Sequence, residues 1–350
     1  MYKGYKIVVN TAAGRRRYMQ YLVPFVVASD IVDRYDIWVN THNMADIEFF
    51  KMLADRFPVV NLVWQPDRYV NGISSINAFY RICIEEKTIY FKMDDDIVWM
   101  ESDAIQKMVD FRIANPQYFL VSPLVINNSL STYLLQVTGK LKLNAYYNSS
   151  ANSPILWKNG HFAFQLHKWF LEKYLKTHKY ADLHVGKHEM GMTRFSINAI
   201  LWFGEDMKAL NGIVPGDDEE FLSCIRPTQL GKANCWNGDT IFLHFAFSPQ
   251  REQLDKQTIL ERYGAYLLED WSKDERMSAV SDAVLEMMKS IAERESQLMA
   301  LPSPYKKPIS EKSPMSFKEK LFALAPSFLK ELWTLYRQNN PNKNSTFIIS

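Results

Sequence analysis

The sequence predicts an α/β fold of the Rossmann-like type, with a mostly parallel sheet, helices on both of its faces and a C-terminal helical extension. Three observations support this prediction. Short apolar runs alternate with helical patterns through the first hundred residues. Hydrophobic residues make up 47% of the 350 residues, which provides a sizeable core. Helical patterns with many charges then run over 255–299, after the last apolar run.

The elements of the first hundred residues follow one another in a regular rhythm. Buried strands are expected at Lys6–Val9, Asp36–Val39, Val59–Trp64 and Thr88–Lys92, and helical periodicity falls between them over Tyr18–Ala28, Ala45–Arg56 and Ser74–Cys83. Strands that alternate with helices in this way form a parallel sheet. Ligands bind such sheets at the carboxyl ends of the strands. The loops after Val9, Trp64 and Lys92 should therefore share one crevice.

Composition divides the chain into a main domain over 1–250, a helical extension over 251–300, and a linker with a tail over 301–350. The linker, 301–315, holds four prolines and shows no periodicity. Beyond it, apolar residues recur at helical spacing from Phe317 to Tyr336, with a break or kink at Pro326. The last 50 residues carry eight Lys/Arg and three Glu, a net charge of +5. Such a tail suits peripheral attachment to an anionic inner membrane through residues 316–337, or packing on its own domain or on a partner subunit.

Charge and cysteine usage exclude several classes of protein. The net charge of +2 argues against a dedicated nucleic-acid binder, which carries a clear basic excess. Cys83, Cys224 and Cys235 form no CxxC pair and no disulfide framework, which favours a reducing compartment. No apolar run has the length of a signal peptide core or of a membrane span. We therefore expect a cytoplasmic protein, with the cytoplasmic face of the inner membrane as the alternative for the tail.

An acidic run, Asp94-Asp95-Asp96, directly follows the fourth predicted strand. Three adjacent carboxylates repel one another, and a divalent cation neutralises them well. Mg²⁺ and Mn²⁺ prefer oxygen ligands and take one or two carboxylates together with substrate phosphates. The alternative is an Asx-rich turn that leads into a helix near Ser102–Ile113. The position at the end of a strand favours a metal site.

A second acidic cluster, Asp217–Glu220, follows Pro215-Gly216. One interpretation is a helix start, with Asp217 as N-cap and Glu220 completing a capping-box-like pair. Because a carboxylate at a helix start is rigidly held, Asp218 is also a candidate general base. Asp217 would lie beside the substrate.

Other candidate residues lie in the stretch from 120 to 250, which is rich in Trp, Tyr, His and Asn and suits a polyol-binding wall. His244 lies in a strand-like run and is either a core residue or a metal ligand that joins Asp96. Glu205 and Asp206, beside Trp202, would bind sugar hydroxyls, supply the base, or form a surface turn. His161 is an acceptor-side or surface residue.

The order of these parts resembles the GT-A glycosyltransferases over roughly residues 5–250. Met93–Ile97 (MDDDI), Gly216–Glu220 (GDDEE) and the His244 strand look like bacterial inverting enzymes of the family 2 type, including galactofuranosyltransferases. The resemblance implies a GT-A catalytic domain whose nucleotide-binding half is 1–100 and whose acceptor half is 101–250. It also implies that Asp94 contacts ribose or metal, that Asp96 and His244 bind the metal, and that Asp218 is the base.

The resemblance also places a nucleotide against three loops. In the first loop, the small residues Thr11, Ala12 and Gly14 permit close backbone contact, and Arg15 would meet the diphosphate. The alternative interpretation of Arg15–Arg17 is a solvated basic face. Asp95 would lie beside the nucleotide. Asp67, Arg68 and Asn71, after the third strand, are candidates for contact with the base or ribose, or form an ordinary polar loop.

The function that this resemblance implies is metal-dependent inverting transfer of a hexose, with galactofuranose as one candidate, from a UDP-sugar to a glycan or lipid-linked glycan acceptor. The cofactor would be Mn²⁺ or Mg²⁺, and the product a bacterial surface polysaccharide such as O-antigen or capsule. The first alternative is a sugar nucleotidyltransferase. The expected glycine-rich loop is absent, since Gly14 is the single glycine of Asn10–Arg17. The second alternative is a nucleotide-binding GT-A scaffold without catalytic activity.

Overall fold

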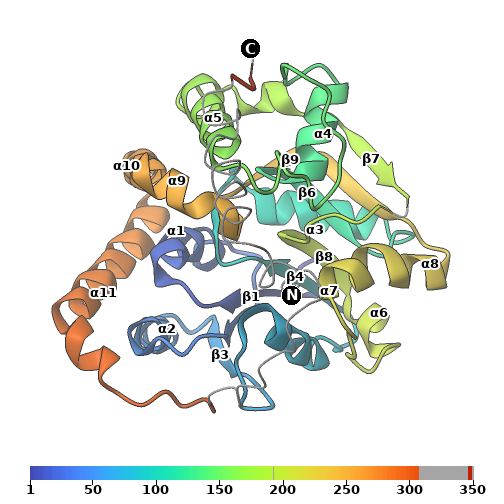
Figure 1. Ribbon diagram of the computed structural model, residues 1–350. Coiled ribbons are helices and arrows are strands. Elements are labelled where there is room, and N and C mark those ends of the chain that lie inside the picture. The colour runs from blue at the N-terminus through green and yellow to red at the C-terminus, as the bar shows by residue number, and fades with distance from the viewer. Residues whose placement is uncertain (192, 307–345, 349–350) are drawn as a thin grey trace, which may run out of the picture.

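The computed structural model describes residues 1–191, 193–306 and 346–348, and Figure 1 shows a central sheet with helices around it. The strands are β1 (Lys6–Ala13), β2 (Arg34–Val39), β3 (Val60–Trp64), β4 (Thr88–Met93), β5 (Ile97–Met100), β6 (Val121–Ile126), β7 (Lys187–Met190), β8 (Ala199–Phe203) and β9 (Asn234–His244). The α-helices are α1 (Arg16–Val27), α2 (Met44–Arg56), α3 (Ala104–Ala114), α4 (Ser129–Val137), α5 (Gly160–Phe170), α6 (Gly204–Lys208), α7 (Asp218–Glu220), α8 (Arg226–Leu230), α9 (Arg251–Lys256), α10 (Ile259–Trp271) and α11 (Glu275–Met299). Short 3₁₀ segments are η1 (Gly72–Ile82), η3 (Tyr180–Leu183) and η5 (Ser248–Gln250), and π-helical turns η2 (Leu171–Leu175) and η4 (Phe221–Ile225) continue α5 and α7.

The strands of the described residues form one nine-stranded sheet in the order β3-β2-β1-β4-β8-β6-β9-β5, with β7 paired to β9. Its first half, from β3 to β4, is entirely parallel. The carboxyl ends of these four strands therefore meet at one edge, as the alternation of strands and helices predicts. The predicted α/β, Rossmann-like class is confirmed.

The second half of the sheet is mixed. β8 runs antiparallel to β4, with Met93 opposite Ala199 and Ile89 opposite Phe203. β9 is parallel to β6 and antiparallel to β5. In the last of these pairings Ile97 lies opposite His244. This register brings His244 next to the end of the acidic run, because Ile97 is the residue that follows Asp96.

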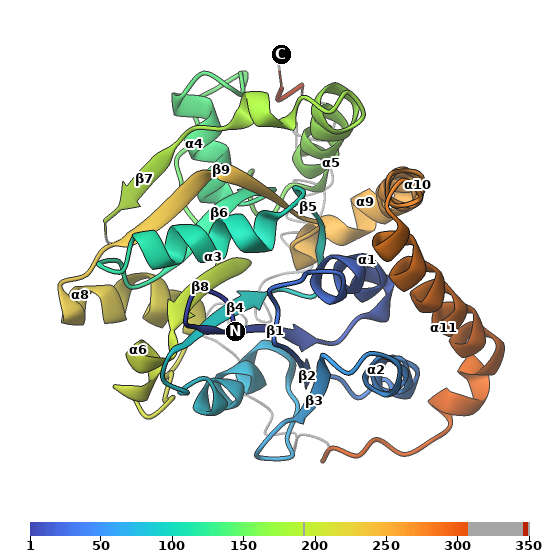
Figure 2. The ribbon, with the colours of Figure 1, turned by 180° about the vertical axis from the view of Figure 1, so that it is seen from behind.

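Side chains alternate between two apolar cores, one on each face of the sheet. On β1, Ile7 and Val9 enter the core that is covered by α1, α2, α3 and α11, while Val8 faces the core beneath η1, α4, α5 and α10. Figure 2 shows α3 across the sheet on the side turned away in Figure 1. Helices thus cover both faces, as predicted.

Two local predictions are wrong. The first loop was expected to begin at Asn10, yet β1 continues to Ala13 because its ladder with β2 runs on to the pair Ala13 and Val39. Thr11 and Ala12 therefore belong to a strand and not to a loop. The surface turn considered after Gly204 is the short helix α6, which follows β8 directly.

The C-terminal extension packs against the main body. One face of α11, including Val284 and Ile291, is buried in the core that also contains α1 and α2. After α11, the Tyr305 hydroxyl donates a hydrogen bond of 2.6 Å to the Val39 carbonyl. Phe347 is buried, and its N–H donates to Gln165 Oε1 at 2.9 Å. The predicted amphipathic tail over 316–337 lies outside the described residues.

No helix in the described part of the chain combines the length and apolarity needed to cross a bilayer.

Candidate active site

The loops at the carboxyl ends of β1, β2, β3 and β4 are joined by hydrogen bonds. The Asn40 side chain, after β2, donates to the Gly72 carbonyl at 3.0 Å and accepts from the Ser75 hydroxyl at 2.7 Å. The Gly14 N–H, after β1, donates to Asp95 Oδ2 at 2.9 Å. These loops therefore lie along one edge of the sheet, while the crevice expected between them stays a prediction.

The chain approaches its neighbours closely at Gly14. A Cβ there would lie 3.3 Å from the Asn40 carbonyl oxygen, which is a tight contact, and 3.9 Å from the Asp95 carboxylate, which is an ordinary one. A side chain at this position would therefore press on the Asn40 loop and not on the acidic run. Gly14 was predicted to approach the nucleotide closely, and in the structure its N–H contacts the Asp95 carboxylate of the protein itself.

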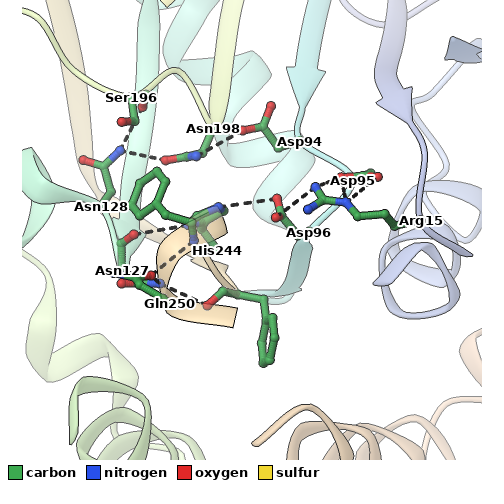
Figure 3. Close-up of polar contacts among 12 residues, drawn as sticks. Arg15, Asp94, Asp95, Asp96, Asn127, Asn128, Ser196, Asn198, His244 and Gln250 are labelled. Carbon is green, nitrogen blue, oxygen red and sulfur yellow. Dashed lines mark hydrogen bonds and ion pairs between the residues drawn. The ribbon is translucent and has the colours of Figure 1, made fainter. Parts of the chain in front are cut away.

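The three aspartates of the acidic run have different surroundings (Figure 3). The backbone holds the run on both sides, since the Asp94 N–H donates to the Asn198 carbonyl and the Phe245 N–H donates to the Asp96 carbonyl, each at 2.8 Å. Asp94 points toward Asn198, whereas Asp95 and Asp96 point toward Arg15. The run therefore presents the Asp94 carboxylate to the start of β8 and the Asp95 and Asp96 carboxylates to the first loop.

Asp96 is buried and faces His244, whose Nε2 lies 3.4 Å from Asp96 Oδ1. The other ring nitrogen, Nδ1, lies 3.2 Å from the Asn127 carbonyl oxygen. A carbonyl only accepts, so Nδ1 carries the hydrogen and Nε2 of a neutral ring presents its lone pair to Asp96. Two acceptors then face each other, which calls for a proton or a cation between them. A histidine whose second nitrogen donates to a carbonyl is also the usual arrangement of a metal ligand.

Two guanidinium groups reach the same carboxylate. Asp96 Oδ2 lies 3.0 Å from Arg15 Nη2 and 3.8 Å from Arg251 Nη2. Burial alone would raise the pKa of Asp96, but the guanidinium groups of Arg15 and Arg251, joined by His244 when its ring carries a second proton, outweigh burial and hold the pKa below its usual range. Asp96 is therefore ionised at neutral pH.

Asp95 is the inner carboxylate of the run and is bound by the first loop. Besides the Gly14 N–H, it accepts hydrogen bonds from Nε and Nη2 of Arg15, and Arg15 Nε lies 3.1 Å from both carboxylate oxygens. Arg15 also lies over the Tyr18 ring at 5.0 Å. Since a bidentate pair fixes a guanidinium, Arg15 is held at the start of α1 beside the acidic run.

Asp94 belongs to a separate polar cluster. Its Oδ1 accepts from Lys92 Nζ at 2.5 Å and its Oδ2 from Asn198 Nδ2 at 3.0 Å. Lys92 is buried, which lowers its pKa, but Asp94 and Asp218 outweigh burial and the net pKa is raised. The structure does not bring the Asp94 carboxylate to the facing pair of Asp96 and His244. In the described residues no group of three or more His, Cys, Asp or Glu side chains is arranged as a metal site.

Asp218 lies at the start of α7, where the predicted helix start is confirmed. Asp217 is the N-cap and accepts from the Glu220 N–H at 3.0 Å. Asp218 is 7% exposed and accepts from the Tyr80 hydroxyl at 3.0 Å. Burial raises the pKa of Asp218, although Lys92 and Tyr80 oppose this. A carboxylate of this kind is a suitable proton acceptor near neutral pH.

The loop before α7 is held by η1, the same segment that carries Tyr80. The Asn77 side chain donates to the carbonyls of Val214 and Gly216 at 2.7 and 2.8 Å. Arg194 adds an outer contact through ion pairs of 2.9 Å with Asp217 and with Glu219. Asp217 is thus occupied by a cap and an ion pair, while Asp218 points inward.

Trp202, Glu205 and Asp206 lie away from this edge. Trp202 is fully buried, with ring centroids 5.9 Å from those of Tyr80 and Tyr90. Glu205 accepts from the Lys87 N–H, which precedes β4. Glu205 and Asp206 lie in α6, after the end of β8 that lies beside Ile89, so about one strand length, roughly 17–20 Å, separates them from Asp94. The predicted sugar contacts of these three residues are not consistent with this placement.

The other predicted residues lie at or beyond the rim of the edge. Asp67 forms an exposed ion pair with Arg81, and Arg68 has a positive φ of 54° and accepts from the Lys306 N–H through its carbonyl. The Asn71 N–H donates to Ser75 Oγ. Thr11 is buried, and its hydroxyl accepts from the Tyr35 hydroxyl at 3.1 Å. His161 lies on α5 beside Gln165 and Phe347.

Four polar residues at the edge were missed from the sequence. Lys92, Tyr80, Asn198 and Arg251 each contact a carboxylate of the site. Lys92 had a detectable signal, because it is the one charged residue in the fully buried run of β4. The others come from segments without a motif, and the fold alone brings them to the edge.

No protein-family model and no curated protein matches this chain. Solved structures of remote similarity include Staphylococcus aureus TarS, with 9% identity over 82% of this chain and 71% of that chain and a TM-score of 0.40. Glucosyl-3-phosphoglycerate synthase from Mycobacterium tuberculosis, in complex with Mg²⁺ and uridine diphosphate, is 12% identical over 76% of this chain and 79% of that chain, with a TM-score of 0.37. A CMP-2-keto-3-deoxy-manno-octonic acid synthetase complexed with CTP is 8% identical over 73% and 98% of the two chains, with a TM-score of 0.40.

Proposed function

We propose that this chain is a metal-dependent inverting glycosyltransferase that moves a hexose from a UDP-sugar to a glycan acceptor. The observation that carries the proposal is the grouping at one sheet edge of a facing Asp96–His244 pair, two guanidinium groups and the buried carboxylate of Asp218. These are a cation site, a phosphate site and a base, which are the three requirements of sugar transfer from a nucleotide donor.

Asp96 and His244 fit one side of a divalent cation site. Their facing atoms are both acceptors, and Asn127 fixes the histidine tautomer in the way expected of a metal ligand. Mg²⁺ and Mn²⁺ are bound in proteins by one or two such residues together with substrate phosphates, so a pair is sufficient. When bound, the cation would neutralise the charge that develops on the departing diphosphate.

Arg15 and Arg251 would bind the diphosphate. Both point at Asp96 Oδ2, and guanidinium groups recognise phosphate oxygens in a fork geometry. Arg15 already pairs with Asp95, so its position is set before a donor binds. The hydrogen bond from the Gly14 N–H to Asp95 joins the residue before this arginine to the run as well.

Asp218 would take the proton from the acceptor hydroxyl as that oxygen attacks the anomeric carbon. A single base of this kind is what an inverting transfer requires. Tyr80 orients the carboxylate, and Lys92 balances the charges of Asp94 and Asp218 inside the protein. The choice of a hexose such as galactofuranose, and of O-antigen or capsule as the product, rests on the likeness of MDDDI and GDDEE to such enzymes. A membrane contact through 316–337 stays a prediction.

The proposal is tested by following UDP release from a set of UDP-hexoses, UDP-galactofuranose included, in the presence of Mn²⁺. Asp218→Asn should lower turnover by roughly 10²–10⁴-fold, because it removes the base, while UDP affinity is retained. Glu220→Gln is the matched control: it lies on the same short helix, its side chain is half exposed, and turnover should be unchanged.

Two results would contradict the proposal. Release of pyrophosphate from a nucleoside triphosphate and a sugar phosphate would identify a nucleotidyltransferase instead. Binding of UDP without turnover of any donor in the presence of lipid-linked acceptors would identify a scaffold that has kept the fold without the activity.

A further inference from the structure

A cavity of about 410 Å³ lies outside the candidate active site. Its walls come from the end of α1, the residues between β5 and α3, and α10. Figure 1 shows α1 and α10 near the start of α11. Arg15 precedes α1 at the active-site end, and Phe25 lines the cavity near the other end. A helix of this length spans about 18 Å, so the two sites are separate. The volume falls within the range of small-molecule sites, about 300–1,000 Å³.

Aromatic side chains form much of the cavity wall. Phe25 and Trp271 pack edge to face with ring centroids 5.4 Å apart, and Trp99 and Tyr180 do the same at 5.3 Å. Tyr266 lines the cavity as well and is only partly buried. Such rings present flat apolar faces to whatever occupies the space.

Two of these side chains also offer hydrogen-bond donors. Trp99 and Trp271 are each 4% exposed, and neither indole N–H has a hydrogen-bond partner in the described part of the chain. The indole nitrogens of Trp38, Trp169, Trp202 and Trp236 are sealed from solvent without a partner, but those of Trp99 and Trp271 are not sealed. Both residues line the cavity, so a ligand there would lie beside two indole groups whose N–H donors no described residue uses.

Carboxylates supply acceptors on the same walls. Asp103 has a positive φ of 56°, and its side chain makes no hydrogen bond within the described residues. Glu101, by contrast, is fixed by His184 at 2.7 Å and by Lys107 at 3.4 Å. Arg276 is paired with Asp30. Asp270 pairs with Lys273, and Asp274 accepts from the Met277 N–H. Among the lining carboxylates of the described chain, Asp103 is therefore the one without a side-chain partner, and the lining is acidic overall.

This combination selects among classes of ligand. An acidic lining repels phosphates and nucleotides. An amine would pair with the carboxylates and stack on the rings, but it would leave both indole donors unused. A neutral saccharide uses the indole donors, the carboxylate and the aromatic rings together. Its hydroxyls accept from indole N–H groups and donate to a carboxylate, and its C–H faces pack on aromatic rings. We propose that this cavity binds an uncharged sugar unit, at a site distinct from that of the nucleotide donor.

The test is the binding of neutral methyl glycosides (glucoside, galactoside, mannoside and N-acetylglucosaminide) to the full chain without nucleotide. Binding is measured by saturation-transfer NMR and by intrinsic fluorescence. Trp99→Phe and Trp271→Phe keep the ring and remove one donor, and each should weaken binding by roughly 2–10-fold. Asp103→Gly, which suits the positive φ and leaves the core untouched, should weaken binding similarly. Trp169→Phe is the matched control, because Trp169 is 8% exposed and its indole nitrogen is sealed.

The proposal fails if no glycoside binds the wild-type chain, if Trp169→Phe weakens binding as much as the cavity variants, or if spermidine displaces the glycoside. It does not rest on the proposed transferase activity. A chain that releases no UDP would still bind glycosides here, and one without this site would still release UDP.

Discussion

Removing the hydroxyl of Tyr80 should shift the pH dependence of the reaction to higher pH. Tyr80→Phe deletes the hydrogen bond of 3.0 Å to the buried Asp218 carboxylate and leaves the ring between Trp38 and Trp202, with centroids 5.7 and 5.9 Å away. A hydrogen bond to a charged group contributes about 1.5–3 kcal/mol. At 1.36 kcal/mol per unit, its loss raises the pKa of Asp218 by about 1–2 units.

The direction in which the pH profile moves follows from the role of Asp218 as the base. Asp218 accepts a proton only when ionised, so kcat/KM rises as the pH passes upward through its pKa. Burial already raises this pKa, and the Tyr80 hydrogen bond opposes the shift. Without that bond the acid limb of the profile of kcat/KM should move up by about 1–2 pH units, while the rate at high pH is largely kept.

The assay is UDP release measured across the acid limb for wild type, Tyr80→Phe and Tyr90→Phe. Tyr90 is the matched control, because its ring also stacks on Trp202 at 5.9 Å but its hydroxyl donates to the Ile82 carbonyl. An acid limb that stays in place in Tyr80→Phe, or moves equally in Tyr90→Phe, would refute the assignment of Asp218 as the base.

Three further predictions concern packing, pH and donor binding. Gly204→Ala should lose about 1–3 kcal/mol or more of its free energy of unfolding and unfold at a lower temperature, because the new Cβ would lie 1.9 Å from the Glu85 carbonyl oxygen. Gly191→Ala is the control: no atom lies near its Cβ position, so its thermal unfolding should be unchanged. Burial lowers the pKa of His167 to about 3, so the folded state excludes a proton that the unfolded chain binds below about 6.5. Stability should therefore fall by about 2 kcal/mol between pH 7 and pH 5 in urea unfolding, and a His167→Gln variant with the same pH slope would contradict this. Arg251→Gln should raise the KM for the UDP-sugar by roughly tenfold, as expected for loss of a phosphate contact. Lys256→Gln on the same helix, where Lys256 pairs with exposed Glu252, should leave the KM unchanged.

The parallel half of the sheet could be predicted because its signals are local. Buried runs such as Thr88–Lys92 and the helical periodicity between them determine strand and helix without reference to distant residues. The helix start at Asp217 was also predictable, since its cap is made within the same turn. The end of β1 was not, because residues 10–13 are held in the strand by pairing with β2.

The arrangement of the site depends on contacts between distant segments, which a single sequence does not reveal. That Asp94 turns to Lys92 and Asn198, while Asp96 turns to His244, is decided by the antiparallel pairing of β8 and β9 with β4 and β5. For Trp202 the sequence suggested a functional role that the fold does not support. Next to Glu205 it looks like a sugar platform, yet the alternation of side chains on β8 places it between Tyr80 and Tyr90 in the core.

The central claim is that Asp96 and His244, and not Asp94, hold the metal with the diphosphate. The most direct measurement is the affinity of Mn²⁺ in the presence of UDP, by electron paramagnetic resonance, for wild type, Asp96→Asn, His244→Gln and Asp94→Asn. We expect at least a roughly tenfold loss of Mn²⁺ affinity in the Asp96 and His244 variants and little change in Asp94→Asn. Unchanged affinity in Asp96→Asn, or an equal loss in Asp94→Asn, would contradict the account.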